Sequence, residues 1–441
     1  MVTPAQSEYL SVMADGTVKQ RHPISDNEVW TVPGRGHRPL GTAHPNSQPL
    51  EASEHGRHCA FCEHRYLETP PEKSRFARDG DRWTLHRHLP ATQLFDSVAE
   101  FRCIPNLFEI LSYEYWHANH GYELSSETKG FRDDYLAEPA GREHVLAVAR
   151  AKMRASGLDA GQVESTPEAQ VLDHASGFFG GGHNVVVARR HFVDGATDTS
   201  QLAGSGTLSV EEHRRYVEFT VLTLQRLQHT IPQSQHVAVF QNWLKPAGAS
   251  FDHLHKQLVA IDSYGSSNKR TITREINEPG FFNTRLMRAA RTHDLVLARN
   301  EHAIAIAGFG HRYPTIKVFS TSATCDPVQQ SRDEVDAMSD LVHAMHAATG
   351  AEVACNEEWH QRPPAVGVRL PWFVNIKWRI STLAGFEGGT KISLNTIAPA
   401  TLKERLLPRL VELRDQGTIA PISIGDECRL GDQPLEYHLG G

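Results

Sequence analysis

Two histidines and a glutamine alternate along one short segment of the chain, at His253, His255 and Gln257. The surrounding residues 251–261 contain no Gly or Pro and end in an apolar run, which predicts a β-strand. Side chains alternate between the two faces of a strand, so these three should point the same way, roughly 7 Å apart from one to the next. Two imidazoles and an amide on one face are too polar for a core, and we interpret them as a site.

The chemistry that this pattern favours is nucleophilic attack on phosphorus. An imidazole such as that of His255 can attack a phosphoryl or nucleotidyl group, hold it as a phosphoramidate and pass it to a second acceptor. Gln257 is suited to orient the phosphate, while Gly248 and Ser250 offer space and a hydroxyl, and Asn242 can hydrogen-bond a ribose or base. The alternative is a set of satisfied, partly buried histidines. The Gly-Ala-Ser run before His-x-His-x-Gln favours the site.

A pair of cysteines, Cys59 and Cys62, has the spacing of a zinc knuckle. A closed tetrahedral zinc site needs two further nitrogen or sulfur ligands, and because no second Cys-x-x-Cys exists, histidines must supply them. The favoured candidates are His191 and His253, and the histidines that also remain open are His58, His64, His88 and His183. A reduced cysteine pair in a turn is the simpler alternative. A redox pair is disfavoured because no βαβ pattern follows.

Two arginines, Arg35 and Arg38, stand among glycines near the N-terminus. Guanidinium groups form bidentate hydrogen bonds with phosphates, so these residues are candidates for phosphate contact. A solvated basic turn is an equally good interpretation of this segment taken alone.

The elements expected around these residues form two similar series. The strands of the first series are expected at residues 28–32, 183–188, 237–241 and 251–261, with a helix beginning at the capping box of Ser209 and Glu212. The strands of the second are expected at residues 303–307, 315–319 and 372–383, with a helix capped by Ser331 and Glu334. This repetition predicts two related α+β units, residues 1–265 and 270–441, joined near residues 263–269. Residues near 105–175, with a helix over 142–155, are interpreted as an insertion.

Length and composition limit the class of protein. The chain has 441 residues, 39% of them hydrophobic and 22% charged, which suits a globular protein of two or more domains. Its formal net charge of −7 argues against a general nucleic-acid binder. No apolar run approaches the ~20 residues of a membrane span, no secretory signal is visible, and six cysteines form no disulfide framework. We therefore expect a cytoplasmic protein without membrane or nucleic-acid partners.

At these residues the chain resembles the galactose-1-phosphate uridylyltransferase family, a branch of the histidine-triad superfamily. The segments that carry the resemblance occur in the family's order, at residues 30–39, 59–62, 69–72, 182–191, 239–242, 248–257 and 384–387. The specific part is His-x-His-x-Gln behind Gly-Ala-Ser. The resemblance spans most of the chain, apart from roughly 105–175.

The resemblance implies an α+β fold of two histidine-triad-like halves, each an antiparallel sheet with packed helices. It also implies a nucleotidyltransferase that works in two steps. His255 would attack the α-phosphorus of a nucleotide-sugar, and the nucleotidyl group would then pass to a sugar-1-phosphate or similar acceptor. Gln257 would stabilise the nucleotidyl-histidine.

The resemblance further implies ligands and partners. A structural zinc would be held by Cys59, Cys62, His191 and His253. The residues expected to contact nucleotide and phosphates are Arg35, Arg38, Asn242, Gly248, Ser250 and Glu387. The family commonly forms homodimers.

The chain departs from the family inside the motif, where Leu254 and Lys256 replace the usual Pro and Gly. Dinucleoside-polyphosphate phosphorylases also carry bulkier residues there, so phosphorolysis or adenylyl transfer is the competing activity. A catalytically silent, zinc-stabilised nucleotide-binding protein is the third possibility. Hydrolases of the superfamily usually have a third histidine at the position of Gln257 and are disfavoured. Residues 375–377 read Asn-Ile-Lys, so no second metal site is expected.

Overall fold

A single twelve-stranded sheet forms the centre of the protein in a computed structural model that describes residues 8–34, 47–381 and 384–439. All its neighbouring strands are antiparallel. In order across the sheet they are β16 (Ser423–Ile424), β10 (Val296–Arg299), β11 (Ala303–Gly308), β12 (Thr315–Ser320), β14 (Phe373–Trp378), β13 (Cys355–His360), β8 (His236–Trp243), β9 (His255–Ile261), β7 (His183–Ala188), β6 (Ala99–Pro105), β4 (Ser74–Asp79) and β5 (Arg82–Arg87).

The sheet consists of two halves that meet at β8 and β13, where Asn242 is in register with Asn356. In the N-terminal half the order outward from this seam is β8, β9, β7, β6, and in the C-terminal half it is β13, β14, β12, β11. The predicted α+β architecture of two antiparallel halves with packed helices is confirmed, and the halves share one continuous sheet. The division at residues 265 and 270 stays a prediction.

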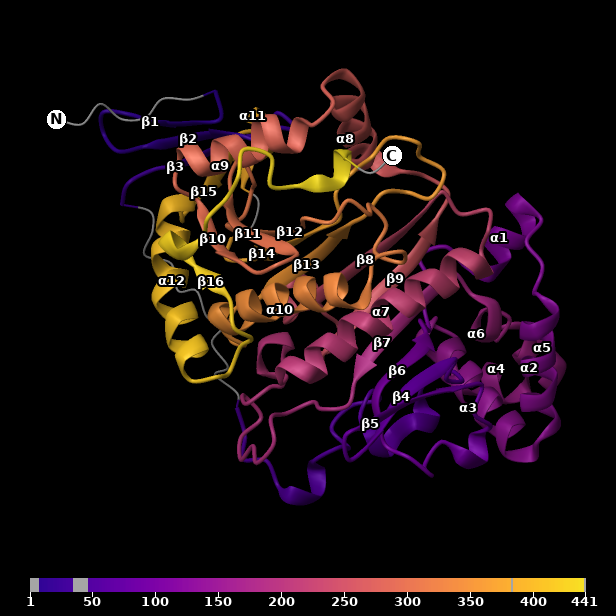
Figure 1. Cartoon of the computed structure of the whole chain (residues 1–441). Helices are drawn as coiled ribbons and strands as arrows, with labels where there is room; N and C mark the ends of the chain where they lie inside the picture. The colour runs from indigo at the N-terminus through magenta and orange to yellow at the C-terminus, as the bar shows by residue number, and fades with distance from the viewer. Residues whose placement is uncertain (1–7, 35–46, 382–383, 440–441) are drawn as a thin grey trace.

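Three long helices, α7 (Val210–Thr230), α10 (Arg332–Thr349) and α12 (Pro399–Asp415), pack on one face of the sheet (Figure 1). The capping boxes predicted for the first two are present: the Ser209 hydroxyl accepts from the Glu212 N–H, and Ser331 does the same for Glu334. The apolar sides of these helices form one buried core with the sheet. The opposite face of the sheet carries the polar side chains described below.

Residues 105–175 form a helical lobe at the right of Figure 1 with a small hydrophobic core of its own. Its helices, with a short one that follows, are α1 (Tyr113–His120), α2 (Ser126–Ala137), α3 (Pro139–Ala155), α4 (Ala160–Ser165), α5 (Glu168–Asp173) and α6 (Gly177–Gly180). The helix predicted over 142–155 is the body of α3, which begins three residues earlier because Pro139 takes the first helical position, where no N–H is needed.

A second, four-stranded sheet connects distant parts of the chain. Its order is β1 (Leu10–Val12), β2 (Val18–Arg21), β3 (Glu28–Thr31) and β15 (Ser393–Asn395), and only the β3–β15 pair is parallel. The remaining α-helices of the described residues are α8 (Gly265–Asn277), α9 (Arg288–Thr292) and α11 (Gly385–Thr390). Residues 263–269, expected to be a linker, therefore include the start of a helix.

The strand expected at 251–261 is shorter than predicted. It begins at His255, and His253 lies in the bend before it. The backbone remains attached to β7, since the Ala188 N–H donates to the Leu254 carbonyl at 3.0 Å. The expectation of three side chains on one strand face is therefore correct only for His255 and Gln257; His253 leaves the strand toward Cys59 and Cys62.

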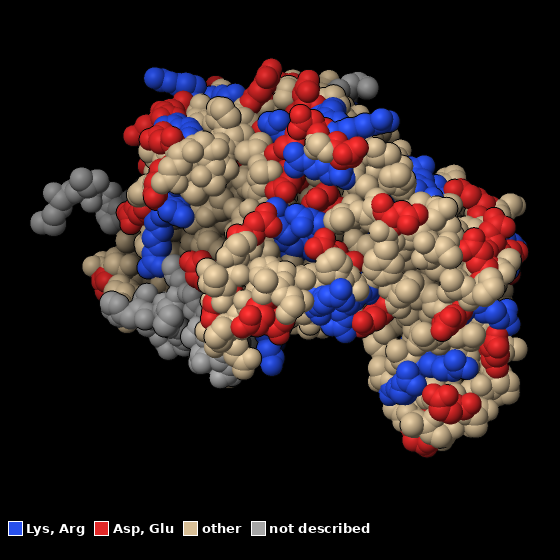
Figure 2. All heavy atoms as spheres, turned by 90° about the horizontal axis from the view of Figure 1, so that it is seen from below, with Lys and Arg blue, Asp and Glu red and all other residues tan. Residues whose placement is uncertain are grey.

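Acidic and basic side chains are interspersed over the face shown in Figure 2, without an extended area of one sign. Within the residues that the structure describes, no helix is both long and apolar enough to cross a membrane.

Candidate active site and metal centre

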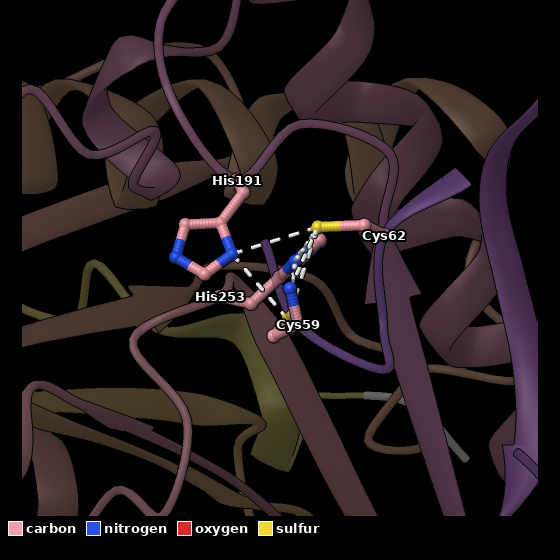
Figure 3. A group of neighbouring side chains, drawn as sticks. All are labelled: Cys59, Cys62, His191 and His253. Atoms are coloured by element: carbon pink, nitrogen blue, oxygen red, sulfur yellow. Dashed lines mark hydrogen bonds between the residues drawn. The ribbon is translucent and has the colours of Figure 1, made fainter. Parts of the chain in front are cut away.

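Four side chains from three separate segments meet at one end of β7 and β9. Cys59 and Cys62 lie in a turn closed by a 3.0 Å hydrogen bond from the Cys62 N–H to the Cys59 carbonyl. His191 follows the end of β7, and His253 precedes the start of β9. Because β7 and β9 are antiparallel neighbours, the end of one lies beside the start of the other, which brings the two histidines together. All four side chains point toward a common centre (Figure 3).

The distances within this cluster match those of a tetrahedral metal site. The two sulfur atoms are 3.9 Å apart, and the histidine Nδ1 atoms lie 3.4 to 3.8 Å from them. Tetrahedral zinc with Zn–S near 2.3 Å and Zn–N near 2.0 Å requires about 3.8 Å between sulfurs and about 3.5 Å between sulfur and nitrogen. The donor set therefore fits a closed metal site. Among the described residues the group contains none of the other histidines considered from the sequence, His58, His64, His88 and His183.

The surroundings prepare these side chains to bind a metal. His253 Nε2 donates to the Ala188 carbonyl at 2.6 Å, which places the proton on Nε2 and leaves the Nδ1 lone pair facing the sulfurs. The neighbouring Cys59 thiol, which can donate to the Cys62 sulfur, is the largest influence on the Cys62 thiol and lowers its pKa. A metal bound here would fix the bend that carries His253.

His255 is buried and held in one tautomer. Its Nδ1 lies 2.7 Å from the carbonyl oxygen of His253, and because a carbonyl can only accept, Nδ1 must carry the proton. Nε2 therefore has a free lone pair. Burial, in addition, lowers the pKa of His255 to about 4, so the ring is neutral near pH 7. A neutral imidazole with an available Nε2 is the form that can act as a nucleophile.

Gln257 is oriented by two residues whose role the sequence did not reveal. The Ile110 N–H donates to His183 Nδ1 at 3.3 Å, so His183 carries its proton on Nε2 and donates it to Gln257 Oε1 at 3.0 Å. Asn106 Nδ2 also approaches Gln257 Oε1, at 3.5 Å. With its oxygen engaged, Gln257 is left to donate through its NH2 group.

His183 is a neutral donor in this arrangement because burial lowers its pKa to about 4. The signal that could have identified it is strand register: Val185 pairs with Gln257, so His183, two residues away on β7, faces the same side. Register between two strands 70 residues apart is not readable from the pattern of either strand. Asn106 follows β6 and gave no sequence signal.

His255 and Gln257 line a cavity of about 490 Å³. Gly248 and Ser250 line it too, and the Gly248 φ of +90° is a left-handed conformation that favours glycine. Apolar side chains make up much of the remaining wall: Phe61, Ile104, Leu107, Phe108, Ile110, Val185 and Phe251. The rings of Phe61 and Phe251 lie 4.6 Å apart at the His255 side.

Two of the other predicted contact residues, Asn242 and Glu387, do not line this cavity. The side-chain oxygen of Asn242 accepts from Asn356 at 2.7 Å, next to the loop that ends at Gly248. Glu387 lies on α11, where its carboxylate accepts from the Ala384 N–H at 2.8 Å. Arg35 and Arg38 fall outside the described residues.

The fold is shared with two solved plant proteins. A GalT-like protein from Arabidopsis thaliana matches with 16% sequence identity and a TM-score of 0.54, over 88% of this chain and 97% of that one. An ADP-glucose phosphorylase from Arabidopsis thaliana, with bound ADP-glucose, matches with 17% identity, the same TM-score and the same coverage. At these identities the likeness establishes the fold, and it confirms the fold predicted from the sequence resemblance.

Comparisons of sequence give a family but no activity. No curated protein matches the chain. A family model described as a domain of unknown function, DUF4921, matches residues 13–437, which is nearly the whole chain. The chain therefore belongs to the DUF4921 family.

Proposed function

We propose that this protein is a nucleotidyltransferase that moves a nucleoside monophosphate from a nucleotide-sugar to a sugar-1-phosphate or similar phosphate acceptor. The observation that carries the proposal is the hydrogen bond from His255 Nδ1 to the His253 carbonyl. This bond leaves a free lone pair on Nε2, at the wall of a cavity of about 490 Å³. The neighbouring amide of Gln257 accepts a hydrogen bond from His183 through its oxygen. Nucleophile and phosphate-orienting donor thus lie side by side.

In the first step, His255 Nε2 forms a bond to the α-phosphorus of the donor, and the bond from that phosphorus to the bridging oxygen breaks. The sugar phosphate leaves with the bonding electron pair. The imidazole becomes positively charged, and its Nδ1–H donation to the His253 carbonyl stabilises that charge. In the second step, a phosphate oxygen of the acceptor attacks the same phosphorus, and the N–P bond breaks to restore the neutral imidazole.

The residues around His255 have distinct roles in this scheme. The Gln257 NH2 group donates to a non-bridging oxygen of the transferred phosphoryl group, and the Ser250 hydroxyl, beside Gly248, donates to the neighbouring phosphate. Phe61 and Phe251 form an apolar wall against which a base can pack. Of the more distant candidates, Arg35 and Arg38 are assigned to phosphate oxygens and Asn242 to the nucleotide, and Glu387 stays a proposed substrate-binding residue without an assigned contact.

Cys59, Cys62, His191 and His253 would hold a structural zinc. Zinc at this position supplies a rigid tether for the bend at His253, whose carbonyl orients the nucleophile. The ligand distances and the second hydrogen bond of His253 to Ala188 support this assignment. We expect one zinc per chain. Homodimer assembly and a cytoplasmic location stay predictions.

Phosphorolysis is the second candidate activity, with inorganic phosphate as the acceptor. One solved protein that shares the fold is an ADP-glucose phosphorylase with bound ADP-glucose, which favours testing ADP-sugars beside UDP- and GDP-sugars. The two activities share the first step and differ only in the acceptor, so product analysis with inorganic phosphate or with sugar 1-phosphates separates them.

The test is intact-protein mass after brief incubation with UDP-, GDP- and ADP-sugars and with diadenosine polyphosphates. We expect a gain of one nucleoside monophosphate with one of these donors, and none in His255→Asn. An adduct of the same size in His255→Asn would show that another residue is the nucleophile. Nucleotide binding without an adduct from any donor would instead support the catalytically silent protein.

A further inference from the structure

The C-terminal half contains a second cavity, of about 440 Å³, on the same face of the sheet as the His255 cavity. It is lined by side chains of β12, β13 and β14, together with the turn after β2 and the start of α8. Across the seam between β8 and β13, strands β14 and β12 hold the positions that β9 and β7 hold in the N-terminal half. The two cavities are therefore counterparts in the two halves.

The walls of this cavity are strongly basic. The cationic side chains among its lining residues are Arg270, Arg312, Lys317, Lys377 and Arg379, and the one carboxylate among its described lining residues is that of Glu358. Lys377 Nζ already binds Glu358 at 2.6 Å. The cavity thus has an excess of positive charge that its own residues do not neutralise.

Lys317 is the central feature of the cavity. Lys317 is 2% exposed, and its Nζ has no hydrogen-bond or ion-pair partner among the residues that the structure describes. The ammonium group instead lies 4.3 Å from the centre of the Phe373 ring. A buried charge without a partner is costly, and such groups are usually paired or bind a ligand.

Burial, followed by the neighbouring Lys377, lowers the pKa of Lys317 to about 7. The group therefore loses much of its charge in the empty cavity. An anion placed beside it would restore the charge and remove the penalty, because an opposite charge at short range favours the protonated form.

Other polar atoms in the wall also lack partners within the described residues. These are His311 Nε2, Asn375 Oδ1 and Arg379 Nε. His22 Nδ1 accepts from the backbone N–H groups of Ile24 and Ser25, at 3.2 and 3.1 Å, so its Nε2 carries the proton. Of these atoms Asn375 Oδ1 can only accept, so the established N–H donors beside Lys317 are His22 Nε2 and the Arg379 guanidinium, and such donors suit a phosphate.

We propose that this cavity binds a small phosphate-bearing anion, either inorganic phosphate or a phosphomonoester, held by Lys317, Lys377 and Arg379. The proposal does not rest on nucleotidyl transfer at His255. The two cavities are nevertheless connected through one hydrogen bond. Asn356 lines the second cavity, and its amide donates at 2.8 Å to the carbonyl of Ala247, the residue directly before Gly248 of the first cavity.

The test is isothermal titration calorimetry of the full chain with inorganic phosphate and, separately, with glucose 1-phosphate. Lys317→Met keeps the volume of the side chain, removes the charge and relieves the burial penalty, so this variant should fold. We expect it to weaken binding of the better probe about tenfold or more. Arg379→Gln should weaken the same binding and serves as the second variant.

Two comparison variants locate the bound anion. Gln257→Leu alters the phosphate contacts proposed for the first cavity, so it should weaken only the part of the binding that occurs there and leave the Lys317-dependent part within about twofold. Lys152→Met removes a distant lysine of the helical lobe and should leave the affinity within about twofold. Tight binding of inorganic phosphate alone identifies the free ion as the ligand, and preference for glucose 1-phosphate identifies a phosphomonoester. The proposal is overturned if the wild-type chain binds neither probe, or if Gln257→Leu abolishes binding while Lys317→Met does not.

Discussion

Lys256 and Glu357 form a fully buried ion pair between the two halves of the sheet, with Nζ and Oε1 2.6 Å apart. Lys256 lies on β9 between His255 and Gln257, and its side chain points to the opposite face, toward the Tyr216 ring on α7. Burial would raise the pKa of Glu357, but Lys256 and then His346 outweigh it and keep the carboxylate ionised. The bulky Lys256 inside the motif thus ties β9 to the C-terminal half of the sheet.

Breaking this pair should be strongly destabilising. Lys256→Met leaves a buried carboxylate with only His346 and Trp359 as partners, and we expect a loss of about 3–5 kcal/mol in the free energy of unfolding. The double variant Lys256→Met/Glu357→Gln should recover a large part of the lost stability. Urea unfolding measures the free energy of unfolding of both variants.

Arg65→Gln, which breaks the exposed pair with Glu68, is the control and should cost about 1 kcal/mol or less. Equal losses in the single and double variants would show that the pair itself is unimportant.

Removal of the proposed zinc ligands should remove the metal. Cys62→Ser is expected to lower the zinc content, measured by inductively coupled plasma mass spectrometry, from about one per chain to near zero and to lower the melting temperature. His58 is the matched control, because its ring packs 4.7 Å from that of His191 without belonging to the cluster. His58→Ala should retain the metal. Full zinc retention in Cys62→Ser, or a stable wild-type protein free of zinc, would contradict the assignment.

His183 should act as a positioning residue for Gln257. His183→Phe fills the same space but cannot donate to Gln257 Oε1, so the amide is free to turn its oxygen toward the phosphate. We expect kcat for nucleotidyl transfer to fall about tenfold to a hundredfold while KM changes little, since the interaction is needed most in the transition state. His183→Gln retains a donor and should recover part of the rate. A change in KM alone would indicate a role in substrate binding instead.

Lys317 should make stability depend on pH above neutrality. Its folded-state pKa of about 7 lies below the value near 10.5 of an unfolded lysine, so between these values the unfolded chain binds more protons and stability rises with pH. The gain between pH 7 and 9 is about 2 kcal/mol. The charged or titratable groups that face it are Lys377, Glu358, His22, His311 and His360. Urea unfolding at both pH values should show this gain in the wild type and not in Lys317→Met. Parallel pH profiles would contradict the low pKa.

Local patterns were sufficient to predict much of the fold. The strand at His183–Ala188 and the helices capped at Ser209 and Ser331 are present at the predicted places, because capping boxes and apolar runs act over a few residues. Boundaries were less accurate: β14 ends at Trp378 rather than 383, and β9 begins at His255. Both ends depend on contacts with other strands, which a local pattern does not contain.

The sequence by itself was sufficient to propose which residues carry the chemistry, since His-x-His-x-Gln and Cys-x-x-Cys each lie within a few residues of chain. Only the tertiary structure decided how these residues are used. It separated His253 from His255, gave Asn106 and His183 their place beside Gln257, and built a basic cavity around Lys317. The physical reason is that these relations depend on strand register and on burial, which arise only when segments far apart in the chain pair and pack.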